Sequence, residues 1–321
     1  MSIQTPERAD RAATDTPGSS ETLIVDEAAK PPKRRRRRRA GHPSRAATVV
    51  VVVCGVVAGL GLWFTFHALV LTSLQEHGSQ ERLYATLRAQ LALATAPLGG
   101  SIASGAPVAL IDSDVPGMQD VVVVEGTDSG DLMLGPGHEP DTPLPGQQGT
   151  SVIFGRSVTY GAPFRSLQQL AVGDEIRVTT SQGRFTFRVE RLRGPGDPAP
   201  VPASDTANLT LVSSASSGWR SGWAPDHAIF VDATLDRGHV QPAPPGRPTS
   251  IPPSEQPMAG DASARILGLF WLQQLVIVGA AVVWARRRWG TWQTWIVGVP
   301  LVIAVLWGAS STLSRLLPNL I

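Results

Sequence analysis

The sequence of 321 residues predicts a mainly β outer domain, a small closed barrel, carried by three transmembrane α-helices. Three stretches are long and apolar enough to cross a bilayer, and the chain between the first two changes to short β-branched runs broken by Gly, Pro and Asp. In chain order we expect a disordered tail (1–48), a transmembrane helix (49–71), a juxtamembrane helical segment (72–99), the barrel (100–235), a Pro-rich linker (236–265), a second transmembrane helix (266–285), a basic loop (286–294), a third transmembrane helix (295–313) and a short tail (314–321).

The first transmembrane stretch, Val49–Leu71, has 23 residues and no formal charge. As a helix it would be roughly 34 Å long, against a hydrocarbon core of about 30 Å. We interpret it as an uncleaved anchor, because no small-x-small cleavage site follows it closely. The tail before it is poor in apolar residues and carries the basic run Lys33–Arg39, which suits anionic lipid and cytoplasmic retention.

Leucines recur every fourth residue from Leu83 to Leu91, which predicts a helix leading away from the membrane over 75–96. At the other end of the outer domain, 236–263 holds seven prolines and no apolar periodicity, so we expect a stiff, extended stalk. The second span carries Gln273 and Gln274 as its strongly polar residues, and the third contains Pro300, which neighbouring helices can accommodate in lipid.

Two arginine clusters set the predicted orientation. Lys33–Arg39 precedes the first span and Arg286–Arg288 follows the second, and positive charge favours the cytoplasmic side. We therefore expect a multi-pass protein of the cell membrane with a cytoplasmic N-terminus and residues 72–265 outside. Gly55 and Gly59 are spaced for close helix approach, so a membrane partner or a homodimer through the transmembrane helices is a further expectation.

The outer domain reads as seven short strands, and Arg184–Val189 alternates polar and apolar residues as a half-buried strand does. Gly183 closes a predicted three-residue hairpin loop, 181–183. Seven strands in about 135 residues favour a small closed barrel over a sandwich. The predicted strands are Val108–Ile111, Val121–Glu125, Thr150–Phe154, Glu175–Thr180, Arg184–Val189, Leu209–Ser213 and Ile229–Thr234.

Composition excludes several classes of function. Residues 101–235 carry 15 acidic and 8 basic side chains, which is a poor surface for nucleic acid. The single cysteine, Cys54, lies in the first span, which excludes a disulfide framework, a CxxC zinc site and a thiol nucleophile in the outer domain. Phosphate-binding glycine loops, carboxylate–histidine metal clusters and cofactor motifs are absent from the sequence, so we expect no metal and no cofactor. Asp112, Asp114 and Asp120 are close together, as solvated acids before a strand commonly are.

Five short motifs then occur in the order and spacing of a known family. They are Val124-Glu125-Gly126-Thr127, Leu134-Gly135-Pro136-Gly137-His138, Pro143-Leu144-Pro145-Gly146, Thr159-Tyr160-Gly161-Ala162-Pro163-Phe164 and Val172-Gly173-Asp174-Glu175-Ile176. From about Val108 to Leu235 the sequence resembles the sortases, in particular those of actinobacterial class E, and the Ala-, Arg-, Gly- and Pro-rich, Lys-poor usage also resembles actinobacterial proteins. The resemblance implies a β-barrel and an extracytoplasmic transpeptidase. In such enzymes a cysteine thiolate attacks a Leu-Pro-x-Thr-Gly-like signal, a histidine handles protons and an arginine stabilises the oxyanion.

The catalytic positions depart from the family pattern. The family's Gly-His-Arg corresponds to Gly155-Arg156-Ser157, so Arg156 stands at the histidine position. Leu-Thr-Leu-Thr-Thr-Cys corresponds to Leu209–Ser214, so Ser214 stands at the cysteine position. The family's arginine falls on His227 or Ala228. An arginine cannot accept a proton at physiological pH, and a serine without a base is a poor nucleophile.

The leading hypothesis is therefore a membrane-anchored pseudo-sortase, a binding protein rather than an enzyme, which holds an extended peptide, a cell-wall fragment or a membrane partner. Candidate groove residues are Arg156, Ser214, His138, Trp219 and Trp223. Arg156 suits a carboxylate or phosphate or pairs with a surface acid, and the two tryptophans grip a ligand or pack beneath their own loop. The alternative is a divergent transpeptidase or serine hydrolase in which His227 or His138 activates Ser214. A third hypothesis makes the barrel a sensor domain for a partner in the bilayer.

Overall fold

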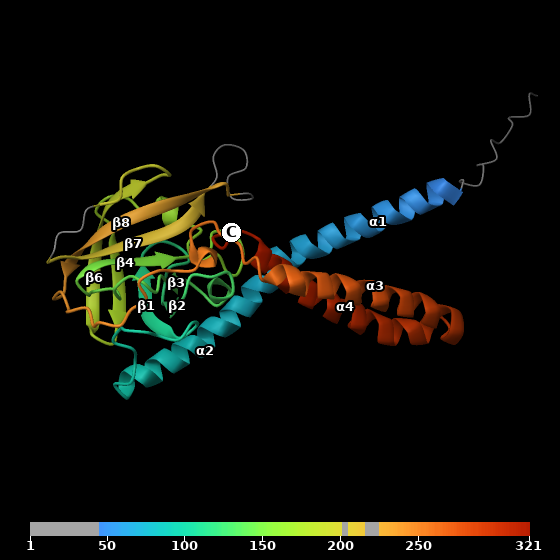
Figure 1. Ribbon diagram of the computed structural model, residues 1–321, viewed down its shortest axis with the longest axis horizontal. Helices are drawn as coiled ribbons and strands as arrows, with labels where there is room; N and C mark the ends of the chain where they lie inside the picture. Colours follow the sequence, from blue (N-terminus) through green and yellow to red (C-terminus); the bar gives the residue numbers. More distant parts are fainter. Residues whose placement is uncertain (1–44, 201–204, 216–224) are drawn as a thin grey trace, which may run out of the picture. The chain divides into compact units, whose positions relative to one another are not determined.

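The computed structural model describes residues 45–200, 205–215 and 225–321. The first helical region consists of α1 (Arg45–Phe66), a π-helical turn η1 (His67–Leu71) and α2 (Thr72–Ala92). The backbone stays helical at both junctions, so the first span continues directly into the juxtamembrane helix (Figure 1). The four residues from Arg45 to Thr48, which we assigned to the disordered tail, already belong to α1, because they precede an apolar run without a helix-breaking residue.

The β domain is a closed barrel of eight strands in the order β1-β2-β3-β4-β7-β8-β6-β5. The strands are β1 (Pro107–Ser113), β2 (Val121–Glu125), β3 (Gly137–His138), β4 (Gly149–Phe154), β5 (Glu175–Thr180), β6 (Gly183–Arg193), β7 (Ala207–Ala215) and β8 (His227–Arg237). The mainly β barrel expected from the sequence is thus confirmed (Figure 1).

Two details of the strand prediction are wrong. β3 was not predicted, because a strand of two residues has no alternation to detect; it completes the barrel by pairing with β2 and β4. The β5–β6 hairpin is tighter than expected, since Thr180 pairs with Gly183 and leaves a loop of two residues. Gly183 has φ +138°, a conformation in which a side chain would be strained.

The barrel interior is filled by apolar side chains from nearly every strand, and β5 alternates buried and half-buried positions accordingly. Phe187, Leu209, Leu211 and Val231 belong to this core and are fully buried. A smaller apolar cluster lies apart from it and contains Leu132, Phe154, Val212 and Leu320. Leu320 comes from the last residues of the sequence, so the chain's end contributes to the packing of the barrel domain.

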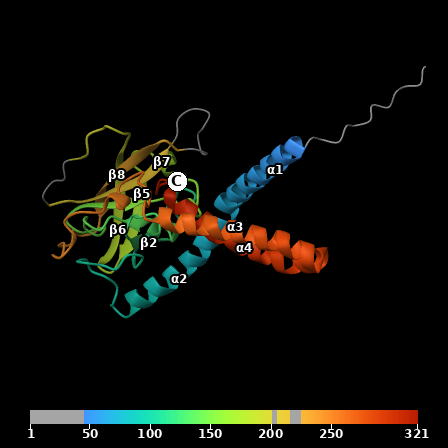
Figure 2. The ribbon, with the colours of Figure 1, turned by 45° about the vertical axis from the view of Figure 1, so that its right-hand side comes forward.

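The second and third apolar stretches form a helical hairpin, α3 (Ala264–Trp289) and α4 (Thr291–Leu316), which run side by side in both views (Figure 2). Together with the first helical region, they give three helices long and apolar enough to cross a membrane. The loop expected over 286–294 is wrong, since Gly290 alone separates the helices. Arg286–Arg288 lie in the last turn of α3, where positive charge is favoured by the helix dipole.

The Pro-rich linker and the tail also differ from expectation. The linker is not a free stalk: Gln241 bridges to Gln147, and the Glu255 carbonyl accepts a hydrogen bond from Thr127 at 2.9 Å. The short tail expected over 314–321 begins inside α4 and then packs against the barrel domain. Proline removes backbone donors but leaves every carbonyl free, so a Pro-rich chain can still be fixed by such contacts.

Candidate functional site

Strand pairing brings the two main site positions together. β4 and β7 run parallel, with Phe154 opposite Val212, so Arg156 and Ser214 leave the same end of the barrel. Gly155, which links the end of β4 to Arg156, has to be a residue without a side chain, because a Cβ on it would lie 2.3 Å from the Phe164 ring. The Gly155 carbonyl accepts a hydrogen bond from Ser213 Oγ at 2.8 Å, which fixes the turn to the neighbouring strand.

Arg156 is almost fully buried, with 1% of its surface exposed, and it does not line an open groove. Its guanidinium donates five hydrogen bonds to four residues, with lengths between 2.8 and 3.2 Å. The acceptors are the Leu132 carbonyl, the Thr159 hydroxyl, the Ile321 carbonyl, and the Ser129 carbonyl and hydroxyl. Its charge lies 5.0 Å from the centre of the Tyr160 ring. Among the described residues its hydrogen-bond partners are backbone and hydroxyl oxygens, so the expected pairing of Arg156 with the side chain of a surface acid is not found there.

Burial lowers the pKa of the Arg156 guanidinium to about 10. The group therefore stays protonated at neutral pH and cannot act as the general base that the family's histidine supplies. Its five hydrogen bonds offset the cost of burying a charge that, within the described residues, has no Asp or Glu side chain as a partner. Arg156 thus holds together the 129–132 loop, Thr159 and the end of the chain.

Ser214 is buried on β7, opposite Ala228 on β8. Its hydroxyl lies 2.6 Å from Ser157 Oγ and donates to the Leu320 carbonyl at 2.7 Å. The same carbonyl accepts the Ser157 N–H at 3.0 Å. Among the described residues, a histidine, lysine or carboxylate is absent from the hydrogen-bond partners of Ser214, so the hydroxyl has no group that would take its proton.

The two histidines considered as partners of Ser214 point elsewhere. His138 is buried; its Nδ1 lies 2.8 Å from Glu125 Oε2, and its Nε2 is 3.0 Å from the Pro143 carbonyl. His227 pairs with its neighbour Asp226 at 2.7 Å and stands opposite Ala215 in the sheet. His138 is therefore no open groove residue, and neither Ser–His pair forms. Trp219 and Trp223 lie outside the described residues.

Several buried carboxyl groups surround this end of the barrel. Burial raises the pKa of the Asp131 carboxyl to about 6, against the lowering effect of the hydrogen bond from Ser104. Burial also raises the pKa of Glu139 to about 7, with Asp141 adding to the rise. Within the described ranges, groups of three or more His, Cys, Asp or Glu arranged to hold a metal ion are not found.

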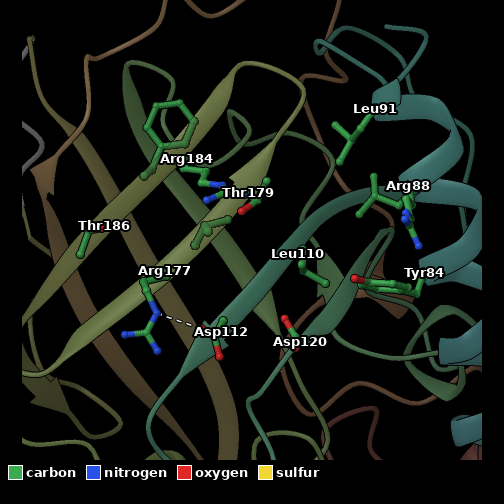
Figure 3. A pocket seen from close by; sticks show the side chains of 13 residues that line it. Tyr84, Arg88, Leu91, Leu110, Asp112, Asp120, Arg177, Thr179, Arg184 and Thr186 are labelled. Carbon is green, nitrogen blue, oxygen red and sulfur yellow. Dashed lines mark hydrogen bonds and ion pairs between the residues drawn. The ribbon is translucent and has the colours of Figure 1, made fainter. Parts of the chain in front are cut away.

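A cavity of about 490 Å³ lies away from this site, between α2 and the barrel wall (Figure 3). Tyr84 and Arg88 approach it from α2, and Asp112 and Arg177 approach it from β1 and β5. Arg177 donates to Asp112 and to Asp114 at 2.8 Å each, so these two acids are ion-paired rather than merely solvated. The cavity is lined by a different set of residues from the Arg156–Ser214 site.

The barrel domain is the part of the chain that resembles a known protein family. The Sortase domain profile matches residues 114–215, a range that ends one residue after Ser214. Sortase D of Bacillus subtilis (strain 168) is 34% identical over 92 residues, which are 29% of this chain and 42% of that protein. The chain carries a sortase-family domain. The alignment covers less than half the length of the Bacillus subtilis protein.

Two solved sortase structures are similar to part of this chain. The Clostridium perfringens Sortase D5 transpeptidase matches with a TM-score of 0.40 and 23% identity, over 49% of this chain and 98% of that one. Sortase E from Streptomyces avermitilis matches with a TM-score of 0.34 and 29% identity, over 42% and 91%.

Sequence reasoning found Arg156 and Ser214 but missed their partners. Ser157 contributes both a hydroxyl and a backbone N–H, and Leu320 contributes the carbonyl that both serines address. Pro318, directly after an apolar helix, signals that the helix stops, yet it does not indicate where the following residues go. The partners are 57 and 106 residues away from Ser214 along the chain, so local patterns could not reveal them.

Proposed function

We propose that the sortase-family domain of this protein binds an extended peptide on the outer side of a membrane and does not cleave it. The observation that supports this function is the environment of Ser214. Its hydroxyl contacts Ser157 and a backbone carbonyl, whereas the catalytic mechanism of the family requires an activated nucleophile and a base. Arg156, at the histidine position, is protonated and already donates hydrogen bonds to five backbone and hydroxyl oxygens.

The peptide-binding part of the proposal rests on the donors that remain. The Ser157 N–H and the Ser214 hydroxyl both donate to the Leu320 carbonyl oxygen, and the Arg156 guanidinium donates to the backbone oxygen of Ile321. Donors fixed in this way can hold a peptide backbone even when no bond is broken. Leu132, Phe154 and Val212 form an apolar pocket beside them. Sorting-signal peptides of cell-surface proteins are the first class of ligand to test, because sortases act on them.

We further propose that α1, α3 and α4 anchor the domain in the cell membrane, with a cytoplasmic N-terminus and an outer barrel. The arginines of the α3–α4 turn favour the inner side. The chain enters the hairpin at Ala264, after the linker that contacts the barrel, and it leaves α4 at Leu316 to contact the barrel again. Both ends of the hairpin are then on the barrel's side, as this orientation requires.

The test uses the full chain in lipid nanodiscs, because residues after 250 contribute to the site. The protein is incubated with a Leu-Pro-x-Thr-Gly peptide and an amine acceptor, and intact-mass spectrometry follows the acyl adduct while calorimetry follows binding. A second sample ending at Leu317 removes the chain's own Leu320 from the site. We expect peptide binding to the shortened chain without an adduct in either sample. Peptide turnover that disappears in Ser214→Ala would contradict the proposal and make the protein a serine transpeptidase.

A further inference from the structure

The residues after α4 leave the helix and enter the site as an extended segment. Leu317 has φ −71° and ψ 156°, an extended conformation, and Pro318 prevents the helix from continuing. Asn319 and Leu320 have no exposed surface. We name residues Leu317–Ile321 the terminal segment (end of the red ribbon in Figure 1). Two of the five residues of this segment are therefore as buried as those of the barrel core.

The backbone of the terminal segment uses the donors described above. The Leu320 carbonyl accepts from the Ser157 N–H at 3.0 Å and from Ser214 Oγ at 2.7 Å. The Ile321 carbonyl accepts from Arg156 Nη1 at 2.8 Å and from the Thr159 hydroxyl. Ser214 and Arg156 are the two positions at which the catalytic cysteine and histidine stand in the family. The terminal segment therefore occupies the place at which a catalytic member would hold its substrate.

The side chains of the terminal segment are recognised as well. Leu320 packs into the apolar pocket of Leu132, Phe154 and Val212. The Asn319 side-chain amide donates to the Thr127 carbonyl at 2.9 Å and to the Gln256 carbonyl at 3.0 Å. Its backbone N–H donates to the Ala259 carbonyl at 2.7 Å. Asn319 is thus recognised by hydrogen bonding and Leu320, the next residue, by shape. The segment also begins with Leu-Pro, as the signal of the family's substrates does.

We infer that the terminal segment is a tethered ligand of the sortase-family domain, and that a peptide from another protein enters the site only after displacing it. This inference rests on the proposed function and adds its regulation. A ligand joined to its site by a short connection has an effective concentration in the millimolar range, so a free peptide at micromolar concentration competes poorly. The apparent affinity for a free peptide falls by the fraction of protein in which the site is open.

The tether also joins the site to the membrane part of the protein. The terminal segment follows α4 without an intervening loop, and the Arg315 carbonyl is bound by the Asp261 N–H at 2.9 Å. α4 in turn contacts the first helical region through Ser310, which accepts a hydrogen bond from Trp63 Nε1 at 3.1 Å. A movement of the α3–α4 hairpin would therefore pull the terminal segment from the site. The α3–α4 hairpin is thus the part of the protein whose movement would open the Arg156–Ser214 site.

The test measures binding of a fluorescein-labelled peptide with the sequence of residues 314–321, by anisotropy, to the full chain in nanodiscs. Leu320→Asp places a charge in the apolar pocket, and a chain ending at Leu317 removes the contacts altogether. Val172→Asp is the matched control, because Val172 is 70% exposed on the barrel. We expect at least about tenfold tighter binding to both tail variants than to the wild type and to Val172→Asp.

Hydrogen–deuterium exchange of the terminal segment in the wild type provides an independent measurement, and we expect slow exchange. Fast, unprotected exchange overturns the inference, as does equal peptide affinity in all four proteins; in the latter case the peptide-binding function still stands. Absence of binding to the chain ending at Leu317 overturns the proposed function. With a protected segment, that result makes residues 317–321 a fixed part of the domain and the tethered-ligand inference wrong too.

Discussion

Arg156→Lys is the most informative single substitution for the stability of the site. It keeps the positive charge and changes the shape of the donor group. Arg156 makes five hydrogen bonds in a planar fork, and a lysine ammonium offers three donors from one atom. At least two bonds are lost. A hydrogen bond involving a charged group contributes ~1.5–3 kcal/mol, so the substitution should lower the free energy of unfolding by ~3–6 kcal/mol.

The assay is thermal unfolding of the full chain in detergent at pH 7, followed by intrinsic tryptophan fluorescence. A loss of this size should lower Tm by at least ~6 °C, since 1 kcal/mol corresponds to ~2–4 °C in a domain of 150 residues or more. Arg165→Lys is the control, because Arg165 is exposed and donates to nearby carbonyls at 3.2 and 3.5 Å. The control should change the unfolding free energy by less than ~0.5 kcal/mol. If Arg156→Lys leaves Tm within 2 °C (roughly 1 kcal/mol) of wild type, the five bonds do not stabilise the domain.

Three further substitutions test the pH dependence and the packing of the domain. The raised pKa of Asp131 means that the folded protein binds its proton more tightly than the unfolded chain, so stability falls as pH rises from about 4 to about 6. Asp131→Asn should flatten the dependence of Tm on pH over that range, whereas the exposed Asp120→Asn should leave it unchanged; identical profiles would show that burial of Asp131 has no energetic consequence. Gly155→Ala should cost ~1–3 kcal/mol, because its Cβ meets Phe164, while Gly78→Ala, in a helix with free space around it, should be neutral or stabilising. Equal Tm values for these two glycine variants would refute the packing argument. His138→Ala removes the partner of the buried Glu125 and should cost ~2–5 kcal/mol, against less than ~0.5 kcal/mol for His77→Ala in an exposed pair; urea unfolding monitored by circular dichroism measures both, and similar midpoints would contradict the importance of burial.

The sequence by itself determined the features that depend on local pattern. Alternation within Arg184–Val189 predicted the strand that lies inside β6, and the long apolar runs predicted the three helices that are long and apolar enough to cross a membrane. The motif spacing indicated the sortase-like barrel, and reading along the motifs predicted that Arg156 and Ser214 stand at the family's histidine and cysteine positions. These inferences succeed because a residue's neighbours in the chain decide strand alternation, helix length and motif identity.

Tertiary structure alone decided what those altered positions contact. β3 is too short to carry a pattern and exists because β2 and β4 present free backbone groups on either side of it. Arg156 looked like a surface ligand in the sequence, yet the fold buries it beneath Ile321, which lies 165 residues away. In the sequence the terminal segment is only part of a short tail (314–321) after the third span, and its burial depends on a pocket assembled from Leu132, Phe154 and Val212. Hydrogen bonds and apolar contacts between distant segments are settled only when the whole barrel closes, because each partner is too far along the chain to leave a local signal.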